Sequence, residues 1–203
     1  STTGIGSITI NSNGNIEFGI ESFTDSKINS MQLYTNETCT FKQSSFTRVK
    51  IPSKLEVHSV KGIDFNLNSF ESSSAHEIDV YTDGAVKFES ESFKDSSSFE
   101  SLTVHAAFNV SFEQRSFLDS QIQKLNVIWE KGTNGQIYLD VDQSSTVSFI
   151  EESFKNCNQL SSVTINSENV DIQSNSFQDS KSLKKLDVHA KGKVKFKFHG
   201  FFL

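Results

Sequence analysis

Apolar residues along this chain occur in pairs separated by one polar residue, and the pairs recur in two series. The first series is Ile8/Ile10, Met31/Leu33, Leu55/Val57, Ile78/Val80, Leu102/Val104, Leu125/Val127, Val163/Ile165 and Leu186/Val188. The second series is Ile16/Phe18, Cys39/Phe41, Ile63/Phe65, Val86/Phe88, Val110/Phe112, Val147/Phe149, Val170/Ile172 and Val194/Phe196. A period of two is typical of a strand with one buried face. The pattern therefore predicts two short strands in each of about eight repeated units.

A Ser-Phe dipeptide marks the same point of each unit. The phenylalanines are Phe23, Phe46, Phe70, Phe93, Phe117, Phe154 and Phe177, and Phe201 follows a glycine instead. Their spacings are 23, 24, 23, 24, 37, 23 and 24 residues. Such regularity indicates a solenoid, in which each unit buries its apolar side by stacking on its neighbours.

The single 37-residue interval indicates an insertion. Within it, Asn134-Gly135 lies between two strand-like stretches. Asn-Gly is a strong hairpin signal, because both central residues of the tight turn need positive φ. We therefore expect a β-hairpin insertion at about residues 128–144.

The stretch SFKNCNQLSSVTI, residues 153–165, resembles the A-F-x-x-C-x-x-L-x-x-I-x-I pattern of the BspA-like leucine-rich repeats, with Ser153 in place of alanine. The resemblance covers nearly the whole chain. It implies one leucine-rich-repeat solenoid over residues 1–203, a β-rich fold of about eight coils of 23–24 residues. A parallel sheet forms one face and short extended segments form the other. A right-handed parallel β-helix is the alternative, although the bulky Ser-Phe turn favours the leucine-rich repeat.

The residue that follows each pair of the first series faces away from the core. Equivalent positions on parallel strands lie ~4.8 Å apart, so these residues form a column across the sheet. The column is Asn11, Tyr34, His58, Tyr81, His105, Ile128, Asn166 and His189, and Trp129 follows Ile128. Rings that combine contact area with a polar tip suit a protein or glycan partner. The alternative explanation is that aromatic residues simply favour exposed strand positions.

A neighbouring outward column places Glu56 and Asp79 on adjacent strands. Paired carboxylates can act as general acid and base or help to bind a cation. No basic residue, glycine loop or further acid recurs beside them in the motif, which favours two solvated acids. His58 and His105 are two coils apart, roughly 10 Å, which is too far for both to bind one zinc ion. We predict no enzyme activity, no metal and no cofactor.

The predicted binding surface is the exposed sheet face. It comprises Tyr34, Glu56, His58, Asp79, Tyr81, His105, Ile128, Trp129 and His189.

Composition narrows the classes of partner. The formal charge of −6 and the pI near 5.4 argue against a nucleic-acid or anionic-membrane surface, which needs concentrated Lys and Arg. The alternating lysines of residues 191–197 indicate one exposed face of a strand. No apolar run approaches ~20 residues, so we expect no membrane insertion. Cys39 and Cys157 fall several coils apart, and we expect both to be free and buried.

The resemblance to BspA-like proteins implies adhesion to, or recognition of, a protein, extracellular-matrix or glycan partner at the cell surface or outside the cell. A cytosolic location stays open, because no signal-like segment begins the sequence. Asn36 and Asn109 begin N-x-S/T triplets and are candidate glycosylation sites in a secreted protein. We expect Asn36 to be buried at the end of its strand and Asn109 to be the better acceptor.

Two other functions stay open. A structural or self-associating protein would form homo-oligomers through its end coils, since terminal coils of a solenoid need to be covered. A β-helix enzyme acting on a polysaccharide would require Glu56 and Asp79 to catalyse the reaction.

Overall fold

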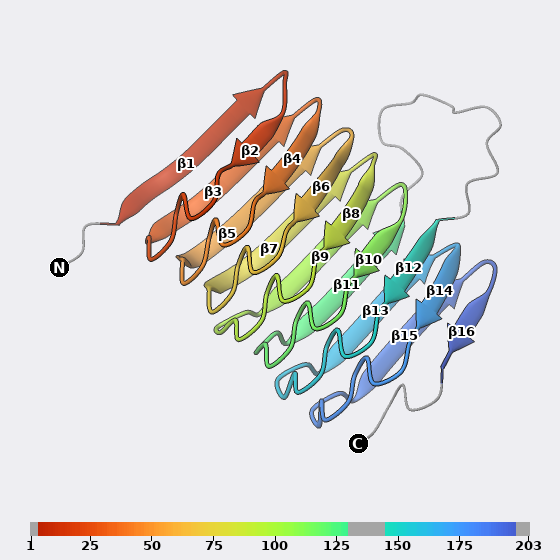
Figure 1. The fold of residues 1–203 in the computed structure, drawn as a ribbon. Coiled ribbons are helices and arrows are strands. Elements are labelled where there is room, and N and C mark those ends of the chain that lie inside the picture. The colour runs from red at the N-terminus through yellow and green to blue at the C-terminus, as the bar shows by residue number, and fades with distance from the viewer. Residues whose placement is uncertain (1–3, 130–144, 198–203) are drawn as a thin grey trace.

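The computed structural model describes residues 4–129 and 145–197. These residues form a parallel β-solenoid of about eight coils, and each coil contributes one strand to each of two eight-stranded sheets (Figure 1). The described residues contain no helix, and hence none long and apolar enough to cross a membrane. The solenoid of about eight coils predicted from the sequence is confirmed, with an extended strand on both faces of the coil.

Sheet A contains the first strand of each coil, in the order of the chain. Its strands are β1 (Ile5–Ser12), β3 (Ile28–Thr35), β5 (Lys50–Ser59), β7 (Ser74–Thr82), β9 (Ser101–Ala106), β11 (Lys124–Trp129), β13 (Ser162–Ser167) and β15 (Lys185–Ala190). The first apolar series lies in register across it, with Leu55 opposite Ile78 and Val57 opposite Val80. All the neighbouring strands are parallel.

Sheet B contains the second strand of each coil. Its strands are β2 (Ile16–Phe18), β4 (Thr38–Phe41), β6 (Gly62–Phe65), β8 (Ala85–Phe88), β10 (Val110–Phe112), β12 (Thr146–Phe149), β14 (Asn169–Ile172) and β16 (Val194–Phe196). The second apolar series lines its inner face, and Val86 lies opposite both Ile63 and Val110.

Two stacks of phenylalanine rings fill much of the space between the sheets. In the sheet B stack, Phe65 lies parallel to Phe88 with ring centroids 4.8 Å apart. In the turn stack, Phe70 lies parallel to Phe93 at the same spacing of 4.8 Å. The stacks meet edge to face, as Phe65 and Phe93 do at 5.3 Å. Both arrangements are favourable for aromatic quadrupoles, and the stacked spacing matches the distance between parallel strands.

The Ser-Phe turns form a third ladder alongside the two sheets. The backbone N–H of Phe46 donates to the carbonyl of Ser69 in the next coil at 2.7 Å, and Phe70 donates to Ser92 at the same distance. Residues two positions before and two positions after each phenylalanine have positive φ of 55–60°. They are Glu21, Asp25, Ser44, Arg48, Asn68, Ser72, Glu91, Asp95, Arg115, Asp119, Glu152, Asn156, Asn175 and Asp179. Two left-handed residues per coil therefore shape this turn.

The predicted hairpin at about 128–144 lies outside the described residues, apart from Ile128 and Trp129, which end β11. Both sheets continue in register on either side of it. In sheet B, β12 pairs with β10, and Val147 lies opposite Val110. The extra length of the sixth unit therefore falls between β11 and β12 in the sequence.

Candidate functional site

Four rings on the outer face of sheet A form one continuous stack, which we call the ring ladder: Tyr34, His58, Tyr81 and His105. They lie on β3, β5, β7 and β9 in direct register. The successive ring centroids are 4.7, 4.5 and 4.7 Å apart, with interplanar angles of 17, 8 and 14°. In-register parallel pairing places equivalent side chains at strand spacing, so the alternating Tyr and His positions become stacked rings.

The ring ladder lines an open groove of about 710 Å³ at the carboxyl ends of these strands. The other lining residues come from the strand ends and the turns that follow: Asn11, Ser12, Asn13, Thr35, Asn36, Ser59, Val60, Thr82 and Asp83. Most of these residues are polar. The groove therefore offers hydrogen-bonding groups next to aromatic surface.

Glu56 joins the ring ladder to the neighbouring outward column. Its Oε1 atom accepts a hydrogen bond from the Tyr34 hydroxyl at 3.2 Å and lies 2.8 Å from Nε2 of His58. Burial alone would raise the pKa of Glu56, but the hydrogen bonds from His58, Lys54 and Tyr34 together lower it. Burial, and then the Glu56 charge, raise the pKa of Tyr34. Glu56 is therefore a carboxylate that holds two rings of the ladder in place.

Lys54 lies between the two carboxylates that the sequence singled out. Its Nζ atom is 3.1 Å from Glu56 and 2.7 Å from Asp79. The hydrogen bond to Asp79 is the largest of the effects that raise the pKa of Lys54. A register shift between Ile51 and Lys54 accommodates the extra residue of this 24-residue coil. The two acids are thus ion-paired through one ammonium group, a contact that the motif did not predict.

The same column continues beyond the ring ladder, but only one of its next three residues has a ring. Ile128 lies opposite His105, Asn166 lies opposite Ile128, and His189 lies opposite Asn166. His189 is exposed and belongs to the last described coil. The structure therefore brings together six predicted binding residues, the ring ladder with Glu56 and Asp79, and places His189 three strands away from His105.

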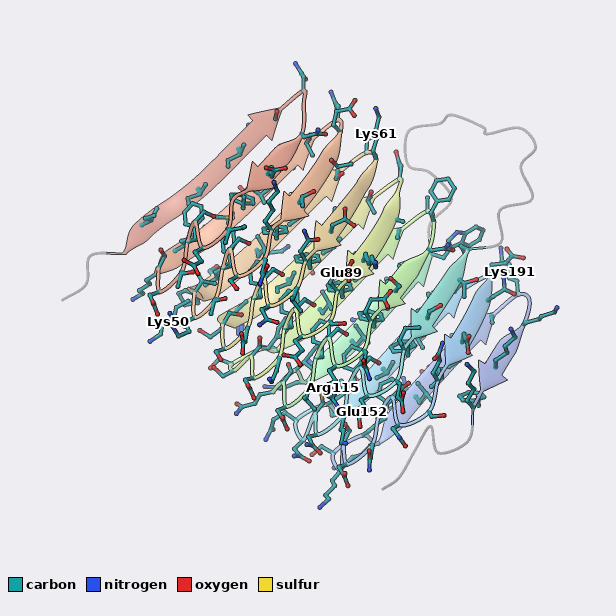
Figure 2. All side chains as sticks on the ribbon, in the orientation of Figure 1. Lys50, Lys61, Glu89, Arg115, Glu152 and Lys191 are labelled. Carbon is teal, nitrogen blue, oxygen red and sulfur yellow. The ribbon has the colours of Figure 1, made fainter. Side chains whose placement is uncertain are left out.

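Trp129 ends β11 and directly follows Ile128 of the column. In the sheet A register it lies opposite Ala106, one residue past the column. Its indole Nε1–H donates to the carbonyl of Ala107 at 3.0 Å, and Nζ of Lys191 lies 4.8 Å from its ring centroid. Figure 2 shows Lys191 toward the end of the solenoid that carries β16. Trp129 therefore packs against the turn that follows β9.

Small hydroxyl residues behind the ring ladder were missed by the sequence reasoning. Thr35 and Ser59 follow Tyr34 and His58, point inward and are buried. The Thr35 hydroxyl donates to the Gly14 carbonyl at 2.5 Å, and the Ser59 hydroxyl donates to the carbonyl of Glu37 at 2.6 Å. These bonds tie the groove wall to the preceding coil. The recurrence of Ser or Thr directly after the column was the available signal.

The expectation that Asn36 is buried is wrong. Thr35 takes the inward position, so Asn36 turns outward, is exposed and donates from Nδ2 to Oδ1 of Asn13 at 3.2 Å. Asn109 is also exposed, and its Oδ1 accepts from the backbone N–H of Thr146 at 2.8 Å. Both candidate glycosylation residues therefore lie at the surface.

Both cysteines are free and buried, as expected. Burial raises the pKa of Cys39 to about 12 and also raises the pKa of Cys157. The Cys157 thiol donates to the carbonyl of Phe117 at 3.0 Å. Within the described part of the chain, no group of three or more His, Cys, Asp or Glu side chains could hold a metal ion.

Comparison with known families identifies the repeat. The family model described as the BspA type leucine-rich repeat region matches six copies, over residues 17–134 and 137–197. Neither a curated protein nor a solved structure matches the chain.

Proposed function

This chain belongs to the BspA-type leucine-rich repeat family, and we propose that it is a non-catalytic binding protein of the adhesion or recognition type. The partner would be a protein, an extracellular-matrix component or a glycan, bound at the cell surface or outside the cell. The observation that carries the proposal is the ring ladder within the groove on sheet A. Repeats of this family are commonly protein-binding or adhesive, which supports the same assignment.

The ring geometry favours a protein partner over a glycan. His58 and Tyr81 each have a ladder ring on both faces, so they present only their edges to the groove. A sugar that binds by stacking needs an open ring face. Ring edges carry hydroxyl and imidazole groups, which suit hydrogen bonds to a polypeptide backbone or to polar side chains.

The ion-paired acids support a non-catalytic function. Glu56 and Asp79 both contact the Lys54 ammonium, and Glu56 also holds Tyr34 and His58. An acid–base pair needs one carboxyl group that keeps a proton at the working pH. The lowered pKa of Glu56 works against that role for Glu56.

The test measures binding of the chain to a basement-membrane extract and to an immobilised oligosaccharide panel by biolayer interferometry. The variant Tyr34→Ala/Tyr81→Ala removes two ladder rings, and we expect at least about a tenfold loss of affinity. The matched control, Lys87→Ala/Ser148→Ala, changes outward positions of sheet B and should bind normally. Unchanged affinity of the tyrosine variant, with circular dichroism showing an intact fold, would refute the ring ladder as the binding site.

A second variant distinguishes binding through the polar ring edges from apolar contact with the rings. Tyr34→Phe/Tyr81→Phe keeps the stack and removes only the hydroxyl groups. If edges mediate recognition, this variant should lose affinity as well. Full binding by the phenylalanine variant together with loss in the alanine variant would favour apolar contact with the rings.

A further inference from the structure

The groove extends differently beyond the two ends of the ring ladder. Among the described residues, the lining of the groove stops at His105 on one side. On the other side it continues past Tyr34 to three residues of the first coil: Asn11, Ser12 and Asn13. The groove therefore extends along the ring face of Tyr34 that points away from His58.

On that side, the column position next to Tyr34 holds Asn11 of β1 instead of a ring. An asparagine side chain ends at Oδ1 and Nδ2, which correspond to the first pair of ring atoms after Cγ in a tyrosine. The space that the rest of a ring would fill next to Tyr34 therefore belongs to the groove, and we call it the Tyr34 slot. Successive ladder rings are 4.5–4.7 Å apart, so a planar group that continues the stack fits the slot at the same spacing.

The charges around the Tyr34 slot favour a positive occupant. The Tyr34 hydroxyl donates to the Glu56 carboxylate at 3.2 Å, which makes the ring more electron-rich, and the face of such a ring attracts cations. Among the described residues that line the groove, Asp83 alone has a fixed charge, and this charge is negative. The ammonium group of Lys54 already lies between Glu56 and Asp79. A cation in the slot therefore meets an electron-rich ring and no lining residue with a fixed positive charge.

Amide oxygens beside the Tyr34 slot suit the guanidinium group of arginine. Oδ1 of Asn13 accepts one hydrogen bond, from Nδ2 of Asn36 at 3.2 Å, and an amide oxygen has a second lone pair. The exposed side chain of Asn11 carries another amide oxygen. A guanidinium group is planar, stacks on aromatic rings and donates up to five hydrogen bonds, whereas an ammonium group is compact and strongly hydrated. Arginine therefore fits the slot better than lysine does.

We propose that the Tyr34 slot binds an arginine side chain of a partner protein. The guanidinium plane stacks on Tyr34 and adds one planar group to the ring ladder, and its N–H groups donate to the amide oxygens of Asn11 and Asn13. The inference rests on the proposed function, because it names the partner side chain that the ring ladder recognises. Asn11 thereby becomes part of the binding surface, as a residue whose short side chain leaves room for the partner.

Nuclear magnetic resonance of the chain with isotope-labelled tyrosine tests the slot directly. The probes are N-acetylated, C-amidated Gly-Arg-Gly, Gly-Lys-Gly and Gly-Phe-Gly, together with methyl β-galactoside as the glycan probe. The Tyr34 signals are those that disappear in Tyr34→Phe. We expect the arginine peptide to shift these signals saturably and to bind at least about threefold tighter than the lysine peptide. Absence of a shift with the arginine peptide, or tighter binding of the phenylalanine peptide or the galactoside, would overturn the proposal.

The variant Asn11→Tyr fills the slot with a ring of the chain itself. The new ring should stack on Tyr34, raise the melting temperature and weaken binding of the arginine peptide by at least about tenfold. The matched control is Asn166→Tyr, the same change in the same column, between Ile128 and His189. Asn166 is not among the residues that line the groove, so this control should bind the peptide as the wild type does. Wild-type affinity in Asn11→Tyr, or an equal loss in Asn166→Tyr, would contradict the slot.

Binding of the whole partner separates this inference from the proposed function. If Tyr34→Ala/Tyr81→Ala loses the partner while Asn11→Tyr keeps it, the ring ladder stays the binding site and the arginine slot is refuted. If Asn11→Tyr loses the partner as well and Asn166→Tyr keeps it, the slot is supported. If all these variants keep the partner, the ring ladder is refuted as the partner site, even where the wild-type chain binds the arginine peptide.

Discussion

The rings of His58 and Tyr81 lie 4.5 Å apart, with 8° between their planes, on the neighbouring strands β5 and β7. Each ring also stacks on a further ring, His58 on Tyr34 and Tyr81 on His105. The rings that offer a binding surface thus also hold four strands together. Binding and stability can be separated because they depend on different parts of each ring, its edge and its two faces.

Tyr81→Ala should lower the free energy of unfolding by about 1–3 kcal/mol, because it removes two stacked contacts of about 0.5–1.5 kcal/mol each. Tyr81→Phe keeps both contacts and should cost about 1 kcal/mol or less. Urea denaturation followed by far-ultraviolet circular dichroism measures both variants. Equal losses in the two variants would show that the hydroxyl group, and not the stack, stabilises this face.

Glu56→Gln should destabilise the protein at neutral pH by about 1–2 kcal/mol, because the carboxylate accepts charge-assisted hydrogen bonds. The pKa of Glu56 in the folded state lies below the ordinary glutamate value of 4.5, so this stabilisation is complete above pH 4.5. It disappears as the pH falls through the lowered pKa of the folded state. Urea denaturation at a series of pH values should therefore show wild type and Glu56→Gln converging in acid.

Asp64 provides a control, because its pKa is shifted in the opposite direction from that of Glu56. Burial raises the pKa of Asp64 above the ordinary aspartate value of 3.8, so its ionisation opposes folding at neutral pH. Asp64→Asn should therefore increase stability at neutral pH, and the gain should vanish in acid. Parallel pH profiles for the two variants would contradict both assignments.

The two cysteines should respond differently to replacement by serine. Cys157 occupies the position that holds Ser96 and Ser180 in other coils. The Ser96 hydroxyl donates to the carbonyl of Phe70, and the Ser180 hydroxyl donates to the carbonyl of Phe154. The Cys157 thiol donates to the carbonyl of Phe117 in the same way. Cys157→Ser should cost about 1 kcal/mol or less, since a donor is kept. Chemical denaturation measures this cost.

Cys39 lies in the sheet B column between Ile16 and Ile63. Cys39→Ser places a hydroxyl in this apolar column and should cost about 1–3 kcal/mol. Burial raises the pKa of the Cys39 thiol to about 12, so a thiol reagent should label Cys39 only after unfolding. Rapid labelling of the native protein would contradict its burial.

Ser72 tests the left-handed turn positions, because it is exposed and has a φ of 55°. Ser72→Val should destabilise the fold by about 1–2 kcal/mol, since a branched side chain is strained in that region. Ser72→Gly should be close to neutral, because glycine adopts positive φ without strain but loses more entropy on folding. Thermal unfolding of the two variants and the wild type measures this difference. Ser53→Val is the control, because Ser53 is exposed and does not have a positive φ.

The solenoid and its core could be predicted from the sequence because they depend on side-chain periodicity alone. Pairs such as Leu55 and Val57 alternate with polar residues, and the fixed spacing of the Ser-Phe anchors sets which pairs meet. The column of Tyr and His residues follows from the same spacing. Each of these features requires only that every coil repeats the preceding one.

Features in which one coil differs from its neighbours could not be predicted in this way. Lys54 reaches Glu56 and Asp79 after a register shift that the repeat pattern does not specify. The inward turn of Thr35, which leaves Asn36 exposed, depends on a hydrogen bond to the Gly14 carbonyl. The place of Trp129 depends on contacts with other coils.

The uninterrupted register of sheet B around the sixth unit makes the solenoid a scaffold for loop grafting. The 37-residue interval exceeds a 23-residue unit by 14 residues, yet Phe149 still lies opposite Phe112. Foreign peptides inserted between β11 and β12 should therefore leave both sheets assembled. The equivalent turn between β7 and β8 is a poor choice, because a Cβ added at Gly84 would collide with the Lys61 carbonyl. Natural variation in loop length within such arrays should accordingly concentrate at turns with room for it, while the strands keep their spacing.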